Sequence, residues 1–219
     1  MAVKKRVVVF DFDGVIADSF SLHLSCWQKV LGDYGASLPE DAVLKALGWS
    51  SFETSRVLVK ESGLAAEPKE VANQKIKLFM ERAERELEMM PGAAAAVARL
   101  SEEFHVAVTS GRSNEIVEPT LQRFGIKDKF DLVMTGDDMQ PQDELDDLLG
   151  LIFERLSIKK ETGVMVDDSR NGLLAAKRAG MKSVAFDSNP KFEVDHSMAD
   201  AVISSLDELQ PELLHAVFN

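Results

Sequence analysis

Residues 6–15 read RVVVFDFDGV, a run of β-branched and aromatic residues that ends in two aspartates and a glycine. The apolar run at 7–10 is too dense for a half-exposed strand, so it predicts a short buried strand. In an open α/β sheet, ligands bind at the carboxyl ends of the strands, where Asp11 and Asp13 stand. Taken alone, these residues also suit an ordinary turn, since Asp and Gly both favour turns.

The composition limits what this chain can be. Its 219 residues are 45% hydrophobic and 28% charged, which allows a sizeable core and excludes a disordered or fibrous protein. The net charge of -12 argues against nucleic acid as a partner, because binding to phosphate backbones needs clustered Lys and Arg. An acidic protein that handles an anionic substrate must concentrate positive charge locally, most simply with a divalent metal.

The sequence also bears on the cellular compartment. Cys26 is the only cysteine, so the chain forms no internal disulfide, and its apolar neighbours predict a buried side chain. No apolar run approaches the roughly 18 residues that cross a bilayer. The apolar stretch after Lys4 and Lys5 ends in acids too soon for a signal peptide. We expect a cytoplasmic protein without membrane contact, either a monomer or a homodimer.

Strand-like runs recur along the chain and alternate with helical stretches. The predicted strands are 7–10, 105–109, 131–134, 163–166, 183–186 and 201–203. Helical spacing follows at 93–103, 115–124, 145–156 and 172–179, and Pro119 is expected in or near the first turn of its helix. The alternation predicts βαβ units with right-handed crossovers, hence an α/β fold: a doubly wound three-layer sandwich around a parallel sheet.

One region breaks this alternation. Between about residues 19 and 90 there is no convincing strand, only helical periodicity at 22–31, 39–47, 51–61 and 67–88. We expect a core domain formed by residues 1–18 and 91–219, with residues 19–90 inserted as a helical-bundle cap over the carboxyl ends of the strands. The alternative is a helical subdomain whose only role is packing.

Polar side chains gather at the carboxyl ends of four predicted strands. They are Asp11 with Asp13, the segment 109–112, the segment 136–141, and Asp167 with Asp168. In a parallel sheet these points converge on one crevice. Packed carboxylates repel one another unless a cation neutralises them, and hard oxygen ligands suit Mg²⁺. The sequence therefore predicts a magnesium site in this crevice.

The chain resembles the haloacid dehalogenase superfamily, in its large subgroup with a helical cap between the first and second motifs. The matching motifs are DFDGV at 11–15 and DDSRNGLLAAKRAGM at 167–181, and Thr109 closes the strand of the second motif. The resemblance covers nearly the whole chain and implies a Rossmann-like core and a hydrolase. Dehalogenases of the superfamily lack the acid two residues after the nucleophile, so Asp13 favours phosphate chemistry.

The resemblance assigns roles to the acids of the crevice. Asp11 would be both a metal ligand and the nucleophile that forms an aspartyl-phosphate. Asp13 would protonate the leaving oxygen and then activate water, and its backbone carbonyl would bind the metal. Asp168 would complete the metal site, with Asp167 assisting directly or through water.

The phosphate side of the site departs from the family at one position. Thr109 and the amide of Ser110 would hold the phosphoryl oxygens, and Arg112 would contact a second phosphate or a carboxylate. Gln140 stands where family members carry a lysine, and glutamine brings no charge. Three explanations stay open: activity is reduced or lost, another cation such as Arg112 or a cap lysine substitutes, or one of Lys127, Lys129 and Lys159 serves. We favour reduced or specialised activity, because those three lysines precede their strands.

Residues 13–27 resemble β-phosphoglucomutase and its phosphatase relatives, such as phosphoglycolate phosphatase, in the spacing of Ser19, His23 and Trp27. By that resemblance His23 couples cap closure to the general acid, and Lys75 on the long cap helix supports it. The alternatives are a core or hinge histidine and a lysine on a solvated helix surface.

The cap loop at 47–53 weakens the mutase interpretation. It offers the apolar surfaces of Trp49 and Phe52 but no arginine of the kind that grips a sugar phosphate. We therefore expect a Mg²⁺-dependent phosphatase of a small phosphorylated metabolite. The alternatives are a phosphomutase on hexose phosphates and a catalytically weakened protein that binds a ligand or partner.

Overall fold

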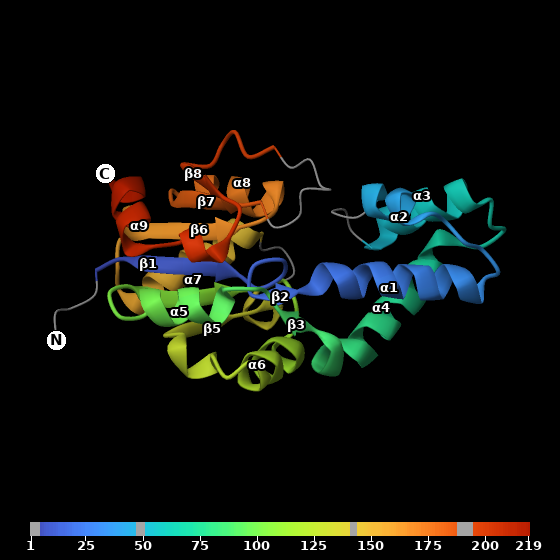
Figure 1. The fold of residues 1–219 in the computed structure, drawn as a ribbon, viewed down its shortest axis with the longest axis horizontal. Helices are drawn as coiled ribbons and strands as arrows, with labels where there is room; N and C mark the ends of the chain where they lie inside the picture. Colours follow the sequence, from blue (N-terminus) through green and yellow to red (C-terminus); the bar gives the residue numbers. More distant parts are fainter. Residues whose placement is uncertain (1–4, 47–50, 141–143, 188–194) are drawn as a thin grey trace. The chain divides into compact units, whose positions relative to one another are not determined.

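The computed structural model describes residues 5–46, 51–140, 144–187 and 195–219. The chain forms two compact units (Figure 1). One comprises Met1–Ala17 together with Met89–Asn219, and the other is the single segment Asp18–Glu88. The chain therefore leaves the first unit once and returns to it once.

A six-stranded sheet forms the centre of the first unit, with strand order β5-β4-β1-β6-β7-β8. Every neighbouring pair is parallel. The strands are β1 (Val7–Asp11), β4 (His105–Thr109), β5 (Leu132–Met134), β6 (Gly163–Asp167), β7 (Lys182–Phe186) and β8 (Ala201–Ile203). The predicted parallel α/β sheet is thus confirmed, and each predicted strand end lies within about one residue of the observed one.

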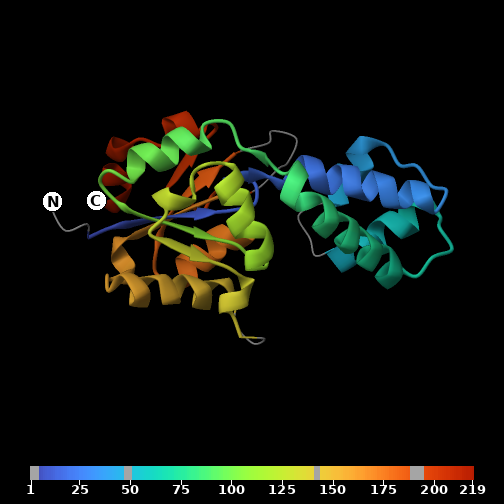
Figure 2. The ribbon, with the colours of Figure 1, turned by 90° about the horizontal axis from the view of Figure 1, so that it is seen from below.

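Helices cover both faces of this sheet. Figure 2 shows α7 (Leu145–Leu156) on one side of the strands and α5 (Ala93–Leu100) with α9 (Pro211–Phe218) on the other. The helix α8 (Arg170–Arg178) packs beside α7 in the same hydrophobic cluster. The result is the three-layer arrangement that the alternating pattern predicts.

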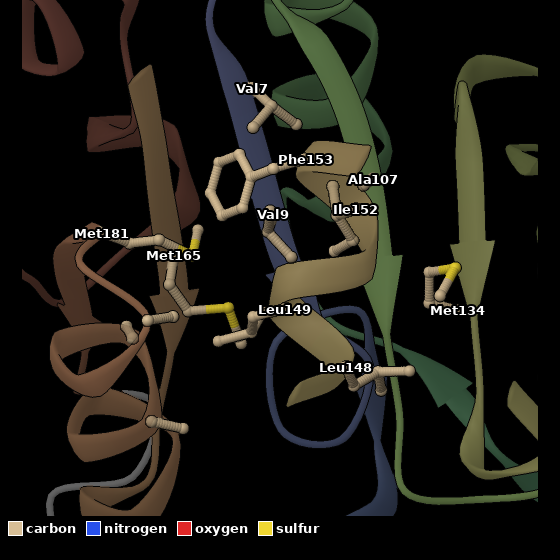
Figure 3. Close-up of a cluster of buried hydrophobic side chains, with 13 residues drawn as sticks. Val7, Val9, Ala107, Met134, Leu148, Leu149, Ile152, Phe153, Met165 and Met181 are labelled. Atoms are coloured by element: carbon tan, nitrogen blue, oxygen red, sulfur yellow. The ribbon is translucent and has the colours of Figure 1, made fainter. Parts of the chain in front are cut away.

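The core under α7 is built from the odd-numbered residues of β1. Figure 3 shows Val7 and Val9 beneath the α7 side chains Leu149 and Phe153. Because β1 lies between β4 and β6 and helices cover both faces, residues 7–10 are fully buried. A central parallel strand with two covered faces needs apolar residues at every position, which is why the run does not alternate.

The helix α6 (Asn114–Arg123) contains Pro119 as its sixth residue. This proline lies inside the helix, in the second turn and close to the first turn in or near which it was predicted. The helix begins at Asn114 because the backbone N–H of that residue donates to the carboxylate of Asp137 at 2.7 Å. A side-chain acceptor thus satisfies one of the N–H groups that a helix start leaves open.

The second unit is helical in its described part. Its helices are α1 (Ser19–Asp33), α2 (Glu40–Ala46), α3 (Ser51–Ser62) and α4 (Pro68–Glu86). They enclose a core of their own, which includes Trp27, Leu31, Val43, Leu58 and Val71. No helix among the described residues is long and apolar enough to cross a membrane.

The expectation of no strand up to residue 90 was wrong at one point. The two-residue strand β3 (Glu88–Met89) pairs with β2 (Ala17–Asp18), and the N–H of Met90 donates to the carbonyl of Ile16 at 2.9 Å. The outgoing and returning chain segments thus run side by side and share backbone hydrogen bonds. A pairing this short leaves no periodic pattern in the sequence.

Candidate active site

A tight turn follows β1 and places its two aspartates. The N–H of Phe12 donates to the carbonyl of Thr109 at 2.9 Å, and the N–H of Gly14 donates to the carbonyl of Ala17 at 2.8 Å. Gly14 has φ of +77°, and a Cβ there would lie 1.9 Å from Oδ2 of Asp168. Glycine is needed both for the left-handed backbone and for the close approach of that carboxylate.

Three carboxylates meet at the carboxyl ends of β1 and β6. Asp11, Asp167 and Asp168 each offer an oxygen, and these oxygens lie within 4.8 Å of one another. The three come together because β1 and β6 are parallel neighbours with Phe10 opposite Val166. All donors are hard carboxylate oxygens, which is the ligand chemistry that Mg²⁺ prefers.

The carboxylate of Asp167 accepts hydrogen bonds through one of its two oxygens. Its Oδ1 accepts hydrogen bonds from the N–H and the hydroxyl of Ser169, both at 2.8 Å. Its Oδ2 is buried and has no hydrogen-bond partner among the described residues. A buried carboxylate oxygen without a partner is costly, and a cation would satisfy it. The residues present therefore fit a divalent metal.

Burial and charge repulsion raise the pKa of two of these aspartates, Asp11 and Asp167. Burial raises the pKa of Asp11 well above its usual range, and the three neighbouring aspartates raise it further. Burial also raises the pKa of Asp167 to about 6, although the hydrogen bonds from Ser169 act in the opposite direction. A bound cation would reverse both effects by favouring the charged forms.

The end of β4 supplies hydroxyl groups to the same edge of the sheet. Thr109 pairs with Asp11 across the sheet, and its hydroxyl is buried without a hydrogen-bond partner among the described residues. The N–H of Ser110, however, donates to the carbonyl of Met134 at 3.0 Å. This amide, which we predicted to hold a phosphoryl oxygen, extends the ladder between β4 and β5 in this structure.

Arg112 is placed against Asp13. Its Nε lies 2.9 and 2.8 Å from the two carboxylate oxygens, and its Nη2 lies 2.7 Å from Oδ1. The hydroxyl of Ser110 is 3.5 Å from Oδ2 of Asp13. Sequence reasoning singled out both Asp13 and Arg112 but did not pair them, because no local pattern links residues so far apart in the chain.

Gln140 is an exposed residue shortly after the 3-10 turn η2 (Gly136–Asp138) that follows β5. Residues 141–143 lie outside the described part of the chain. Lys127 and Lys129 bound the turn η1 before β5, and Lys159 directly precedes the turn η3 before β6. These three lysines therefore lie near the amino ends of their strands, at the edge of the sheet opposite the aspartates.

In the second unit, Lys75 on α4 is buried, with 2% of its surface exposed. Its ammonium group contacts Nδ1 of His23 on α1 and lies 5.4 and 5.0 Å from the ring centres of Trp27 and Phe79. The ring of His23 stacks on Phe79 with centroids 4.2 Å apart. The alternative of a solvated Lys75 was wrong, because α4 turns this residue into the helical bundle.

Two further predicted residues belong to this unit. Ser19 is a buried residue at the start of α1, where Asp18 caps the helix by accepting from the N–H of Ser21 at 3.1 Å. Trp49 lies outside the described residues. Sequence reasoning missed Ser169 and Gly172, which position Asp167; the spacing of a Ser cap three residues before a Gly could have indicated them.

The chain is similar to known proteins in sequence and in structure. A family model described as "Haloacid dehalogenase-like hydrolase" matches residues 8–186. The chain is 27% identical to a putative phosphatase, YhcW, of Bacillus subtilis over 82% of each protein. It is 24% identical to the fructose-1-phosphate phosphatase YqaB of Escherichia coli, over 81% of this chain and 94% of that one. The crystal structure of a putative β-phosphoglucomutase from Thermotoga maritima superposes with a TM-score of 0.74 at 22% identity, covering 96% of this chain and 99% of the other.

Proposed function

The chain belongs to the haloacid dehalogenase-like hydrolase family, and from that premise we propose that it is a Mg²⁺-dependent phosphatase of a small phosphorylated metabolite. One observation carries the proposal. Among the described residues, a buried carboxylate oxygen of the trio Asp11, Asp167 and Asp168 has no hydrogen-bond partner, and neither has the hydroxyl of Thr109, which stands opposite Asp11 on the adjacent strand. These groups offer a place for a cation and, beside it, a donor for a phosphoryl oxygen.

The chemistry follows from the positions of the side chains. Asp11 attacks phosphorus, so a bond forms from its carboxylate oxygen and the bond to the leaving alcohol breaks. Asp13 stands two residues further on, gives its proton to the leaving oxygen, and then accepts a proton from the water that releases phosphate. The hydroxyl of Thr109 donates a hydrogen bond to the transferring phosphoryl group.

Mg²⁺ would be held by Asp11, Asp167 and Asp168, with the backbone carbonyl of Asp13 as a further ligand, and would supply the positive charge that these carboxylates and the phosphate require. The pKa of Asp11, raised in the metal-free protein, would then fall, and its carboxylate would be available for attack. The direction of that shift supports a resident cation.

The substrate class rests on the curated relatives. The Escherichia coli relative is named for fructose 1-phosphate, so a sugar phosphate is the first candidate here. We further propose that residues 19–90 act as a cap on a core of residues 1–18 and 91–219. In this cap Ser19, His23, Trp49 and Lys75 would contribute to substrate selection. We also expect a cytoplasmic monomer or homodimer.

Two other functions each have an observation in their favour. A phosphomutase is supported by the buried contact between Lys75 and His23, the pair that the resemblance to β-phosphoglucomutase singles out. A catalytically weakened binding protein is supported by Gln140, which brings no charge to the end of β5. The phosphatase is preferred because the acid trio, Asp13 and Thr109 supply the groups that hydrolysis needs.

The test is phosphate release from a panel of sugar phosphates and small phosphorylated acids, with Mg²⁺ or with EDTA. We expect turnover that needs Mg²⁺ and is lost in Asp11→Asn by at least about 1,000-fold. Turnover that survives Asp11→Asn would contradict the site. Exchange between hexose phosphates without phosphate release would favour the mutase. An inactive wild type, with activity gained in Gln140→Lys, would favour the weakened protein.

A further inference from the structure

The carboxylate of Asp13 is gripped by a guanidinium group from the neighbouring strand end. The three contacts between Arg112 and Asp13 range from 2.7 to 2.9 Å and engage both carboxylate oxygens. The side chain of Arg112 is only 16% exposed and that of Asp13 29%. A shielded ion pair with a forked geometry is stronger and more directional than a surface salt bridge.

The backbone that carries Arg112 is held on both sides. Its N–H donates to the hydroxyl of Ser110 at 3.1 Å, and its carbonyl accepts from the N–H of Gly136 at 2.8 Å. Gly136 approaches so closely that a Cβ there would lie 2.7 Å from the carbonyl oxygen of Gly111. The backbone from which the Arg112 side chain extends is therefore fixed between the ends of β4 and β5.

The backbone of Asp13 is fixed as well, and the contacts with Arg112 orient its side chain. Asp13 forms an isolated parallel bridge with Ala17 in the turn after β1. The hydroxyl of Ser110 reaches its Oδ2 only at 3.5 Å, which is a long contact. Arg112 supplies the short, paired contacts that select one rotamer of this partly exposed carboxylate.

We propose that Arg112 is a positioning residue for Asp13, which it holds in the orientation that serves the leaving oxygen of the substrate. The inference rests on the proposed phosphatase function and names the residue on which its proton-transfer step depends. Arg112 forms no bond to phosphorus and accepts no proton in this role. The ion pair fixes the rotamer of Asp13, and the proton that Asp13 gives to the leaving oxygen is one that it takes up when the anionic substrate, a further negative charge beside it, is bound. It acts through Asp13, so its removal matters most where the leaving oxygen most needs a proton.

The test compares leaving groups. An alkyl phosphate needs a proton on its leaving alkoxide, whereas p-nitrophenyl phosphate releases a stable phenolate. We expect Arg112→Met to lower kcat/KM for the best alkyl ester by about 100-fold and that for p-nitrophenyl phosphate by less than about 10-fold. Arg112→Lys keeps the charge without the fork, so it should restore the alkyl rate only in part.

A double-mutant cycle gives the second measurement. If Arg112 acts through Asp13, then Asp13→Asn with Arg112→Met should be no slower than Asp13→Asn alone. Arg178→Met is the matched control, because Arg178 is 51% exposed and pairs with Glu144 away from the acid trio. Its alkyl and aryl rates should equal those of the wild type. Circular dichroism and the unfolding midpoint establish that each variant is folded.

The outcomes separate the two proposals. A wild type that releases phosphate, with equal losses on both ester types in Arg112→Met or an additive cycle, overturns the role of Arg112 and leaves the phosphatase standing. A wild type that releases no phosphate from any ester overturns the proposed function, and the role of Arg112 with it. A loss confined to alkyl esters with a non-additive cycle supports both.

Discussion

Gly172 and Asp167 lie so close together that a Cβ on the glycine would stand 1.7 Å from Oδ2 of the aspartate. Gly172 is in the first turn of α8, and its N–H donates to the hydroxyl of Ser169 at 3.0 Å. The same hydroxyl donates to Oδ1 of Asp167. Ser169 and Gly172 at the start of α8 therefore form a cradle, a close-fitting site that sets the position of the Asp167 carboxylate in the acid trio.

Filling this cradle should weaken metal binding. Gly172→Ala must displace the carboxylate of Asp167, so we expect its affinity for Mg²⁺ to fall about 10- to 100-fold, as when a group that orients a ligand is lost. Isothermal titration with Mg²⁺ alone measures this. Gly150→Ala in α7 is the matched control, since among the described residues no atom outside its chain neighbours and its own helix backbone lies within 4 Å of the added Cβ. Equal Mg²⁺ affinity in Gly172→Ala and the wild type would show that the cradle has no such role.

The buried hydroxyl of Thr109 should lower the free energy of unfolding and contribute to phosphate binding. Thr109→Val removes a hydroxyl that has no partner among the described residues, so we expect the free energy of unfolding to rise by about 1 kcal/mol. The affinity for orthophosphate in the presence of Mg²⁺ should fall by about 10-fold, because one charge-assisted hydrogen bond is lost. Urea unfolding and calorimetry measure the two effects.

Thr120→Val separates these effects. Thr120 lies on α6, and its buried hydroxyl also has no partner among the described residues. This variant should gain stability to a similar extent and bind orthophosphate like the wild type. A phosphate affinity that stays unchanged in Thr109→Val would remove Thr109 from the binding site.

The metal-free protein should lose stability as pH rises, because of Asp167. Its pKa is raised to about 6 in the folded chain, from an ordinary value of 3.8. Between these values the folded state holds a proton that the unfolded state has released, so the free energy of unfolding decreases as pH increases through this window. At pH values above this window, the ionised carboxylate of Asp167 lowers the free energy of unfolding by about 3 kcal/mol.

Asp167→Asn cannot ionise and should show a flatter dependence. Urea unfolding in EDTA, repeated from pH 4 to pH 8, compares the variant with the wild type. Asp128→Asn, at an exposed position in η1, controls for the loss of one negative charge. Identical pH slopes in Asp167→Asn and the wild type would mean that Asp167 ionises normally without metal.

Lys75 should prove to be a functional residue rather than a structural one. Replacing a buried charge by an apolar side chain of similar length is often neutral or stabilising, so Lys75→Met should unfold at the same or a higher urea concentration. Its kcat/KM for the best substrate should nevertheless fall by about 10-fold, because His23 loses its partner.

Lys77→Met is the matched control for that experiment. Lys77 stands on the same helix with 79% of its side chain exposed, so neither stability nor turnover should change. If Lys75→Met loses several kcal/mol of stability, and its activity falls only with the folded fraction, the lysine is structural.

Much of the fold could be predicted because burial leaves a local pattern. The apolar run at 7–10 is continuous because both faces of β1 are covered, and the bounds of α7 were predicted correctly from its apolar periodicity. The pairing of β2 with β3 left no such pattern, since it involves only two residues on each side. The contact between the N–H of Ser110 and Met134 could not be predicted, because a sequence does not indicate where a ladder of hydrogen bonds ends.

The sequence by itself determined that acids and hydroxyls stand where parallel strands end, because strand periodicity and the direction of the chain are local properties. The tertiary structure decided which of these groups meet. It joined Arg112 to Asp13 across 99 positions and Lys75 to His23 across 52, and it brought Asp167 beside Asp11 and Asp168, with Oδ2 of Asp167 lacking a hydrogen-bond partner among the described residues. Such contacts depend on strand order and helix packing, which are set by burial of the whole chain rather than by any one segment.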